Sequence, residues 1–379
     1  MNNPSKTPGV VKALAFVCLL GAFCALACTS EPQTGPGESV RFAQFNIWEL
    51  SREKLDQVNA AGEGTSPQLR KAAEIIQRVR PDVLLINEID FDADERLNLQ
   101  RFQERYLGVS QRGQEPLPAY PYTFFEAVNT GVPSGLDLNH DGATDSPEDG
   151  FGYGRYPGQY GMALLSRFPI DEQQARTFQK LLWRQMPGHL IPDGQAGKPA
   201  WYSPGQVEIL RLSSKSHWDV PVRIGSTTVH VLGSHPTPMS FDGDEDRNGR
   251  RNFDESRLWA DYIAGGERAE YIVDDTGTAG ALSTDSLFVV MGDMNNDPQR
   301  DPGPYGMAAM SQILRLERVQ DPLATNEFRS IDYVLPSTGL KVVGQGIFWP
   351  EAGDPLRVLV DEPEPASDHK MNWVDLHIP

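Results

Sequence analysis

The chain has 379 residues, of which 52 are acidic and 34 are basic, and its formal net charge at pH 7 is −18. This length is enough for one large domain or two small ones, and the composition is that of an ordinary globular protein without repeats or low-complexity tracts. The negative charge disfavours non-specific binding to nucleic acids, which needs basic surfaces, unless bound cations or a local basic cleft offset it.

The first 28 residues have the pattern of an export signal. Lys6 and Lys12 precede an uncharged apolar run that is short for a membrane span. The run ends in Ala25-Leu26-Ala27-Cys28, which resembles a bacterial lipobox, although Leu is usual where Ala25 stands. We expect residues 1–28 to be a signal peptide with a lipobox and residues 29–38 to be a flexible tether. The protein would then be exported and lipid-anchored to the bacterial cell envelope, or else simply secreted; an uncleaved anchor is the third alternative.

The three cysteines, Cys18, Cys24 and Cys28, all lie in this leader. The remaining chain therefore has no internal disulfide, although exported proteins often use them. Its core must stabilise the fold alone or with the help of bound metal. Membrane contact is expected only through a lipidated N-terminus, and the sequence indicates no protein partner.

Strands and helices alternate along the chain. Residues 40–47 alternate apolar and polar like a half-buried strand, residues 66–79 have helical spacing, and residues 82–89 form an apolar strand that carries Glu88 near its end. Polar residues at both strand ends indicate a layered sandwich with one functional edge. Further helices are expected over residues 95–106, 255–272 and 305–316. Further strands are expected over residues 120–128, 159–168, 207–214, 218–224, 227–235, 287–291, 330–335, 342–349 and 371–378.

The segment VVMGDMNNDP ends the apolar run 287–291 at Gly292 and then places Asp293 and Asn295 two residues apart. Residues two apart in a strand point to one face. A carboxylate can hold a metal or orient a water, and an amide can hydrogen-bond a phosphoryl oxygen without adding charge. The plain alternative is a strand followed by an Asn- and Asp-rich turn.

Two segments match the spacing of a calcium-binding loop, in which oxygen side chains at alternate positions converge on one ion. The first contains Asp137, Asn139, Asp141 and Glu148, and the second contains Asp244, Asp246, Asn248 and Glu255. The residues after the first loop are Gly-rich, which favours an isolated loop over a paired-helix EF-hand. We expect structural calcium in at least one loop; the alternatives are solvated acidic turns, or a second loop that is a structural turn with Arg250 and Arg251 reaching into the cleft.

The order of the motifs resembles the endonuclease/exonuclease/phosphatase superfamily, which has the deoxyribonuclease I-like fold. The motifs are three strand ends, a GDMN segment, an IDYV segment and an SDH segment, with the side chains Asn46, Glu88, His235, Asp293, Asn295, Asp332, Asp368 and His369. The resemblance extends from about residue 40 to the end of the sequence, so residues 39–379 would form this domain. It implies a four-layered α/β sandwich, with two mixed β-sheets packed face to face, helices outside, and a site at the shared edge of the sheets.

The resemblance also implies roles for these side chains. Mg²⁺, or Mn²⁺, would be held by Glu88 with help from Asn46 and Asp368, and it would neutralise charge that develops on phosphoryl oxygens. His369 and Asp332 resemble the catalytic dyad of the family, in which the carboxylate orients the imidazole and stabilises its cationic form.

The remaining motif residues would act on water and on the phosphate. Asp293 would orient or deprotonate the attacking water, Asn295 would bind a phosphoryl oxygen, and His235 would bind phosphate or protonate the leaving group. Lys215 and His217 are further candidates for substrate contacts, although mixed polar residues at a strand edge are usually only solvated.

These features predict an extracytoplasmic, metal-dependent phosphoesterase that hydrolyses phosphodiesters or phosphomonoesters by attack of water. The acidic surface leaves nucleotides, sugar or inositol phosphates, phospholipid headgroups and scavenged nucleic acid as substrates. The alternatives are an extracellular nuclease and a calcium-stabilised, catalytically inactive binding module of the same fold. The competent side chain at every expected catalytic position argues against the inactive module.

Overall fold

The computed structural model describes residues 39–194, 200–301, 303, 305–361 and 363–379. The expected signal peptide over residues 1–28 and the expected tether over residues 29–38 lie outside the described residues. Within the described ranges, no helix combines the length and the apolar character that a membrane span needs.

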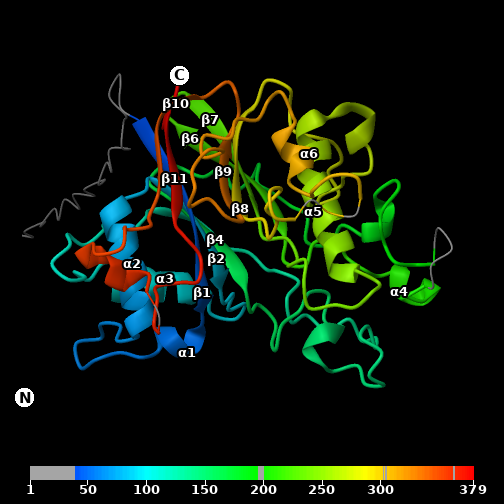
Figure 1. The fold of residues 1–379 in the computed structure, drawn as a ribbon, viewed down its shortest axis with the longest axis horizontal. Coiled ribbons are helices and arrows are strands. Elements are labelled where there is room, and N and C mark those ends of the chain that lie inside the picture. The colour runs from blue at the N-terminus through cyan, green and yellow to red at the C-terminus, as the bar shows by residue number, and fades with distance from the viewer. Residues whose placement is uncertain (1–38, 195–199, 302, 304, 362) are drawn as a thin grey trace, which may run out of the picture. The chain divides into compact units, whose positions relative to one another are not determined.

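Two mixed β-sheets occupy the centre of the described chain (Figure 1). The six strands of the first sheet are β1 (Ser39–Leu50), β2 (Val83–Ile89), β3 (Tyr122–Phe124), β4 (Gly161–Ser166), β10 (Lys341–Ile347) and β11 (Asn372–His377). The five strands of the second sheet are β5 (Arg176–Thr177), β6 (His217–Ile224), β7 (Thr227–Ser234), β8 (Leu287–Asp293) and β9 (Asp332–Pro336). Their orders are β10-β11-β1-β2-β4-β3 and β5-β6-β7-β8-β9. The pairs β1–β2 and β7–β8 are parallel and the others are antiparallel.

The two sheets pack face to face through an apolar layer. Phe42 of β1 and Leu85 of β2 share one buried cluster with Val289 and Met291 of β8. Because successive side chains of a strand point to opposite faces, the intervening residues of each strand lie on the outer faces. Each sheet is therefore apolar on both faces and needs a covering layer outside.

Helices cover the outer faces, which confirms the predicted four-layered sandwich. Helix α2 (Pro67–Val79) packs on the first sheet, and the long helix α5 (Arg247–Ala264) packs on the second. In α2 the Ser66 side chain accepts a hydrogen bond from Leu69 N and Pro67 occupies the first turn, which are common features of a helix start. The shorter helical segments are α1 (Arg52–Leu55), α3 (Asn98–Phe102) with the π-turn Gln103–Leu107, α4 (Pro204–Val207) and α6 (Ser311–Leu314).

Several expected elements differ from the structure. The helix expected over residues 255–272 begins at Arg247 and ends at Ala264, because the residues expected to form a calcium loop already form its first turns. Residues 207–214 are not a strand: after Pro204–Val207, the alternating Leu210 and Leu212 side chains belong to the cluster under α5 instead of lining a sheet. The other differences are in length: the strand expected over 120–128 is Tyr122–Phe124, and the helix expected over 305–316 is Ser311–Leu314.

His217 lies on the outward side of β6 and is fully buried. Its Nδ1 is 2.7 Å from the Ser213 hydroxyl and its Nε2 is 3.0 Å from the Glu255 carbonyl oxygen. A carbonyl can only accept, so Nε2 carries the proton and Nδ1 accepts from the hydroxyl. Burial lowers the pKa of His217 to about 4. Both ring nitrogens are therefore committed inside the protein, and the expectation that His217 contacts a substrate is corrected.

Gly292 allows β8 to approach β7 unusually closely. Its φ is +149°, and a Cβ at this position would lie 2.0 Å from the Ser234 carbonyl oxygen. A side chain here would require a backbone shift in the strand that ends at Asp293. Glycine at this position therefore sets the placement of the Asp293 carboxylate.

Loss of the His217 imidazole should change the pH dependence of stability. The folded protein binds fewer protons than the unfolded chain between pH 6.5 and about 4, so stability is complete above this window and falls by up to about 3 kcal/mol as pH decreases through it. We expect His217→Gln to reduce this fall in the free energy of unfolding, measured by urea denaturation at several pH values. His377→Gln, which changes an exposed histidine of β11, should keep the wild-type slope; an unaltered slope in His217→Gln would contradict the assignment.

Gly292→Ala should lower the free energy of unfolding by about 2 kcal/mol or more, because the methyl group meets backbone atoms. The matched control is Gly225→Ala in the β6–β7 turn, where φ is +60° and no atom lies within 4 Å of the added Cβ. This control has only the conformational cost of about 1 kcal/mol. Equal losses for the two variants in urea denaturation would show that the contact with Ser234 is unimportant.

Candidate active site

Polar side chains replace apolar ones at one end of the layer between the sheets. Along the inward face of β1, Phe42 is followed by Gln44 and then by Asn46, and along β8 Met291 is followed by Asp293. The three polar side chains are at most 1% exposed. Since residues two apart share a face, both strands change from apolar to polar toward the same end of the sandwich. The candidate site lies at this end.

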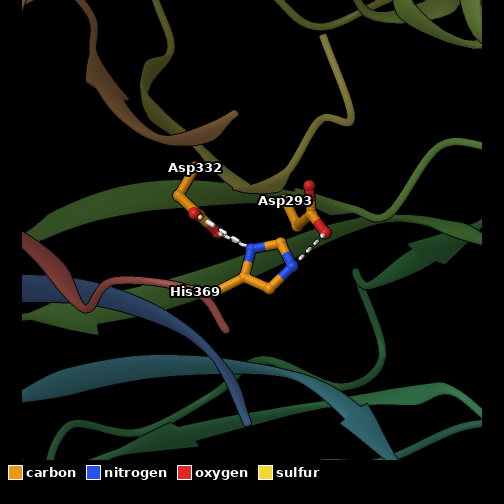
Figure 2. A group of neighbouring side chains, drawn as sticks. All are labelled: Asp293, Asp332 and His369. Carbon is orange, nitrogen blue, oxygen red and sulfur yellow. Dashed lines mark hydrogen bonds and ion pairs between the residues drawn. The ribbon is translucent and has the colours of Figure 1, made fainter. Parts of the chain in front are cut away.

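His369 lies between two carboxylates of the second sheet (Figure 2). Its Nδ1 is 3.1 Å from Oδ2 of Asp332, and its Nε2 is 3.6 Å from Oδ2 of Asp293. Gln44 Nε2 donates to Oδ1 of Asp332 at 3.0 Å, which fixes that carboxylate. Burial alone would lower the pKa of His369, but the charges of Asp332 and Asp293 outweigh it and raise the pKa well above its ordinary value. The imidazole is therefore cationic at neutral pH.

Asp293 is the centre of the hydrogen-bond network. Its Oδ2 accepts from Asn46 Nδ2 at 3.0 Å and lies 3.4 Å from His235 Nε2, and its Oδ1 accepts from Asn295 N at 2.9 Å. Burial would raise the pKa of Asp293, but the charge of His369 and the contact with His235 hold it well below its usual range. The carboxylate thus stays ionised throughout the neutral range.

Asn295 lies beside Asp293, but not as strand alternation predicts. Strand β8 ends at Asp293, and Asn295 has a left-handed φ of +50°. Its side-chain Nδ2 donates to the Pro236 carbonyl oxygen at 3.0 Å. The amide is therefore held by the segment that follows His235.

Glu88 turns toward the site at a β-bulge. Its φ is +67°, and the pairing of β2 with β4 shifts register between Asn87 and Ile89. Oε1 of Glu88 accepts from Asn46 Nδ2 at 3.0 Å, and Oε2 accepts from Glu49 N at 3.0 Å. Without the bulge, Glu88 would point to the face opposite Asn87.

The structure brings His235 and Lys215 to the same region. His235 is 3% exposed, and its Nδ1 has no hydrogen-bond partner among the described residues. Lys215 is 5% exposed. Burial lowers the pKa of Lys215, while the negative charges of Glu255, Glu88 and Asp293 oppose the shift. Lys215 is therefore close enough to both site carboxylates to sense their charge.

Asp368 lies at the solvent side, with 57% of its side chain exposed and Oδ1 3.9 Å from His369 Nε2. Burial raises the pKa of Asp368, and the charge of Glu88 adds to the shift while that of His369 opposes it. Asn46 presents its amide nitrogen to Glu88 and Asp293, while its Oδ1 accepts from Trp48 N at 3.0 Å. Asn46 thus positions both carboxylates, and its Oδ1 keeps a second lone pair, so the expected role of Asn46 as a metal ligand stays a prediction.

The donor set fits a divalent cation. Asp293, Asp332 and His369 have ligand atoms within 4.8 Å of one another and form one possible group. A cationic imidazole has no free lone pair, however, so His369 is a poor ligand in the protonated state. Glu88, Asp293 and Asp368 supply the hard oxygen atoms that Mg²⁺ and Mn²⁺ prefer.

Three supporting residues were not predicted from the sequence. Gln44 Nε2 donates to Oδ1 of Asn87 at 3.0 Å as well as to Asp332, and Ser367 Oγ donates to the Asn46 carbonyl at 2.7 Å. The two-residue period would have found Gln44, which precedes Asn46 by two positions and faces the same way. No local pattern identifies Ser367, because its partner is 321 positions away.

The first acidic loop folds on itself. The carboxylate of Asp137 accepts hydrogen bonds from the amides of Asp141 and Gly142, and Asn139 Oδ1 accepts from Asp141 N at 3.0 Å. Glu148 is exposed. The side-chain oxygens of Asp137, Asn139 and Asp141 thus cap amides within the loop, and its occupation by calcium stays a prediction.

The second acidic segment does not bring its residues together. Asp246 precedes α5 and Asn248 lies within it, where its Nδ2 donates to the Ser240 carbonyl at 2.7 Å. Glu255 is fully buried, and its two carboxylate oxygens accept from Ser214 N and Thr237 N, each at 2.6 Å. Asp244 is exposed on the preceding turn. The expected convergence of Glu255 with Asp244 and Asp246 is therefore corrected.

Arg250 and Arg251, at the start of α5, act as structural anchors. Arg250 Nε donates to the Glu245 carbonyl at 2.9 Å, and Arg251 Nε donates to the Leu212 carbonyl at 2.9 Å. Both guanidinium groups therefore bind backbone carbonyls of neighbouring segments.

Comparisons with known proteins place this geometry in a family. The sequence matches the Endonuclease/Exonuclease/phosphatase family over residues 43–369. A similar solved structure is an endonuclease/exonuclease/phosphatase from Beutenbergia cavernae, with 17% identity, 90% of this chain and 72% of that chain covered, and a TM-score of 0.50. No curated protein matches the sequence.

Two further solved structures have lower scores. A family protein from Leptotrichia buccalis has 13% identity, with 89% of this chain and 100% of that chain covered and a TM-score of 0.45. A mannosyl-6-phosphatase from Bacteroides thetaiotaomicron has 12% identity, with 90% and 100% covered and a TM-score of 0.43. The 17% identity to the Beutenbergia cavernae structure shows a shared fold and not a shared substrate. The family match includes every motif from Asn46 to His369, and the chain belongs to the endonuclease/exonuclease/phosphatase family.

Proposed function

We propose that this protein is a metal-dependent hydrolase of phosphoesters that acts outside the cytoplasm. Family membership supports a phosphoesterase or nuclease type of activity. The observation that carries the proposal is the geometry of His369 between Asp332 and Asp293, with Asn46 connecting Asp293 to the carboxylate of Glu88. This arrangement combines a fixed positive charge, an ionised acceptor for water and oxygen ligands for a cation.

His369 stabilises the charge of the phosphoryl group. Asp332 holds Nδ1, and Gln44 holds Asp332, so the imidazolium needs no reorganisation when the substrate binds. A preorganised cation in a site of low dielectric stabilises a developing negative charge more strongly than water does. Nε2 points toward Asp293 and would donate to a phosphoryl oxygen placed between them.

Asp293 orients the attacking water as a hydrogen-bond acceptor. The water oxygen forms the new bond to phosphorus, the bond to the leaving oxygen breaks, and the water proton passes to the Asp293 carboxylate. His235 Nε2, 3.4 Å from the same carboxylate, donates to the phosphate or to the leaving oxygen. Asn295 binds a second phosphoryl oxygen.

Glu88 and Asp368 would hold the divalent cation, with Asn46 keeping Glu88 in position through its amide nitrogen. A bound Mg²⁺ or Mn²⁺ supplies electrostatic stabilisation of the phosphoryl oxygens. Lys215, buried near Glu88 and Asp293, would add a positive charge toward the phosphate in its protonated form.

The net charge of −18 supports small phosphoesters over long nucleic acids as substrates. The export pattern of residues 1–28 supports an extracytoplasmic location, either anchored by a lipid or secreted. The sequence spacing of the first acidic loop supports structural calcium at Asp137, Asn139 and Asp141.

Removal of the central groups should abolish hydrolysis without unfolding the protein. We expect His369→Ala and Glu88→Gln each to lower kcat about 10²- to 10⁴-fold on a panel of phosphomonoesters and phosphodiesters. His377→Ala is the control, because it removes an exposed imidazole from β11. Wild-type rates in both site variants would refute an enzymatic role for this centre.

Removal of divalent cations should have the same effect as loss of Glu88. Chelation should reduce phosphate release to background, and Mg²⁺ or Mn²⁺ should restore it in the wild type but not in Glu88→Gln. Plasmid nicking measured in parallel decides between phosphoesterase and nuclease. Full activity in chelator would rule out the metal-dependent route, and nicking that exceeds small-ester hydrolysis would favour the nuclease.

A further inference from the structure

Four aromatic side chains lie beside the candidate site, and we call them the aromatic rim: Trp48, Tyr153, Tyr156 and Tyr160. Three of them are strongly exposed, with Trp48 at 44%, Tyr153 at 48% and Tyr156 at 42%. Aromatic side chains usually bury most of their surface in a core or an interface. A group of exposed rings at one place therefore indicates a binding surface.

Hydrogen bonds connect the aromatic rim directly to the site. Trp48 N donates to Asn46 Oδ1 at 3.0 Å, and the next residue, Glu49, donates its N–H to Glu88 at 3.0 Å. The Tyr160 hydroxyl donates to Oε1 of Glu49 at 3.0 Å. Asn46 and Glu49 are the residues that donate hydrogen bonds to Glu88. Trp48 is bonded to Asn46 and precedes Glu49 in the chain, and Tyr160 is bonded to Glu49.

The other two tyrosines of the rim are Tyr156 and Tyr153. The Tyr156 hydroxyl donates to Asp90 at 2.9 Å and is therefore committed to the protein. The ring of Tyr153 stacks loosely on that of Tyr160, with centroids 6.4 Å apart and an interplanar angle of 26°. The aromatic rim would therefore contact a ligand mainly through the faces of its rings.

The loop that carries Tyr153 and Tyr156 is tightly packed along its backbone. A Cβ on Gly152 would lie 1.9 Å from the Ser214 carbonyl oxygen, and one on Gly158 would lie 2.1 Å from the Phe91 carbonyl oxygen. Arg251 also donates to the Phe151 carbonyl at 2.6 Å. Glycine thus lets this backbone lie against the protein body while its large side chains point outward, so the rings are positioned before a ligand binds.

Arg155 lies between the two exposed tyrosines. Its side chain is exposed and makes no ion pair with any described residue. A guanidinium group is planar, stacks on aromatic rings and attracts phosphate. The rim therefore combines π surface with one free cation next to a phosphoester site.

We propose that the aromatic rim and Arg155 form a nucleobase subsite, so that the substrate is a nucleotide or the end of a short single strand whose phosphate lies at His369. This inference rests on the proposed function, because it takes the phosphate of the ligand to bind at the candidate site. A planar base stacks on ring faces, and because the hydroxyls of Tyr156 and Tyr160 are bonded within the protein, these two side chains offer a ligand their rings. The net charge of −18 disfavours a long polyanion.

The test compares adenosine 5′-monophosphate with ribose 5-phosphate, which differ by the base alone. Binding of each to the full chain is measured by calorimetry with Mg²⁺ present. We expect the nucleotide to bind about tenfold more tightly, since base stacking on an aromatic side chain changes affinity about 5- to 150-fold. Tyr153→Ala should remove most of this difference and leave binding of ribose 5-phosphate unchanged, whereas Tyr153→Phe, which keeps the ring, should retain the difference.

Val343→Ala serves as the control for loss of exposed apolar surface, because Val343 is 52% exposed on the edge strand β10. Equal affinities of the two ligands in the wild type, or no binding of the nucleotide at millimolar concentration, would overturn the nucleobase subsite. The same holds if Tyr153→Ala weakens both ligands equally. Binding is measured independently of hydrolysis. If the protein binds the nucleotide more tightly than ribose 5-phosphate but hydrolyses no phosphoester, the proposed function is rejected and the nucleobase subsite is kept.

Discussion

The site depends on one constraint, which is that polar groups buried between two sheets must find partners within the protein. The amide nitrogen of Gln44 meets this constraint by donating to both Asn87 and Asp332, and that of Asn46 meets it by donating to both Glu88 and Asp293. The constraint is not met everywhere, since Gln44 Oε1 and His235 Nδ1 have no partner among the described residues. An unpartnered polar group at these positions would cost free energy that the apolar layer behind it could not easily offset. The same hydrogen bonds that satisfy the amides also fix the carboxylates.

Left-handed backbone conformations gather around this network. Trp48, Glu49, Glu88 and Asn295 all have positive φ although none of them is glycine. Each such residue costs free energy, and the surrounding hydrogen bonds have to hold it in place. Backbone strain is therefore concentrated at the end of the sheets where the candidate site lies. There Glu88 does not follow the alternation of β2, and Asn295 does not continue strand β8.

The sequence was informative wherever a feature depends on local periodicity or on the order of motifs. Alternation and helical spacing identified β1, α2, β2 and β8, and the motif order identified the family and most of the side chains that the structure brings together at the candidate site. The sequence was misleading at Glu255, because calcium-loop spacing does not reveal that the amides of Ser214 and Thr237 take up its carboxylate. Ser367 and the bulge at Glu88 were not predictable, because they arise from distant partners and from register.

The pairing of β1 with β11 joins regions far apart in the chain. Ser39–Leu50 forms hydrogen bonds with Asn372–His377, and His369 lies just before that strand. During synthesis, β1 therefore leaves the ribosome long before its antiparallel neighbour exists. The side chains of the candidate site cannot come together until the segment beyond Ser367 has been translated, so a partly made chain lacks the assembled group of Asp293, Asp332 and His369.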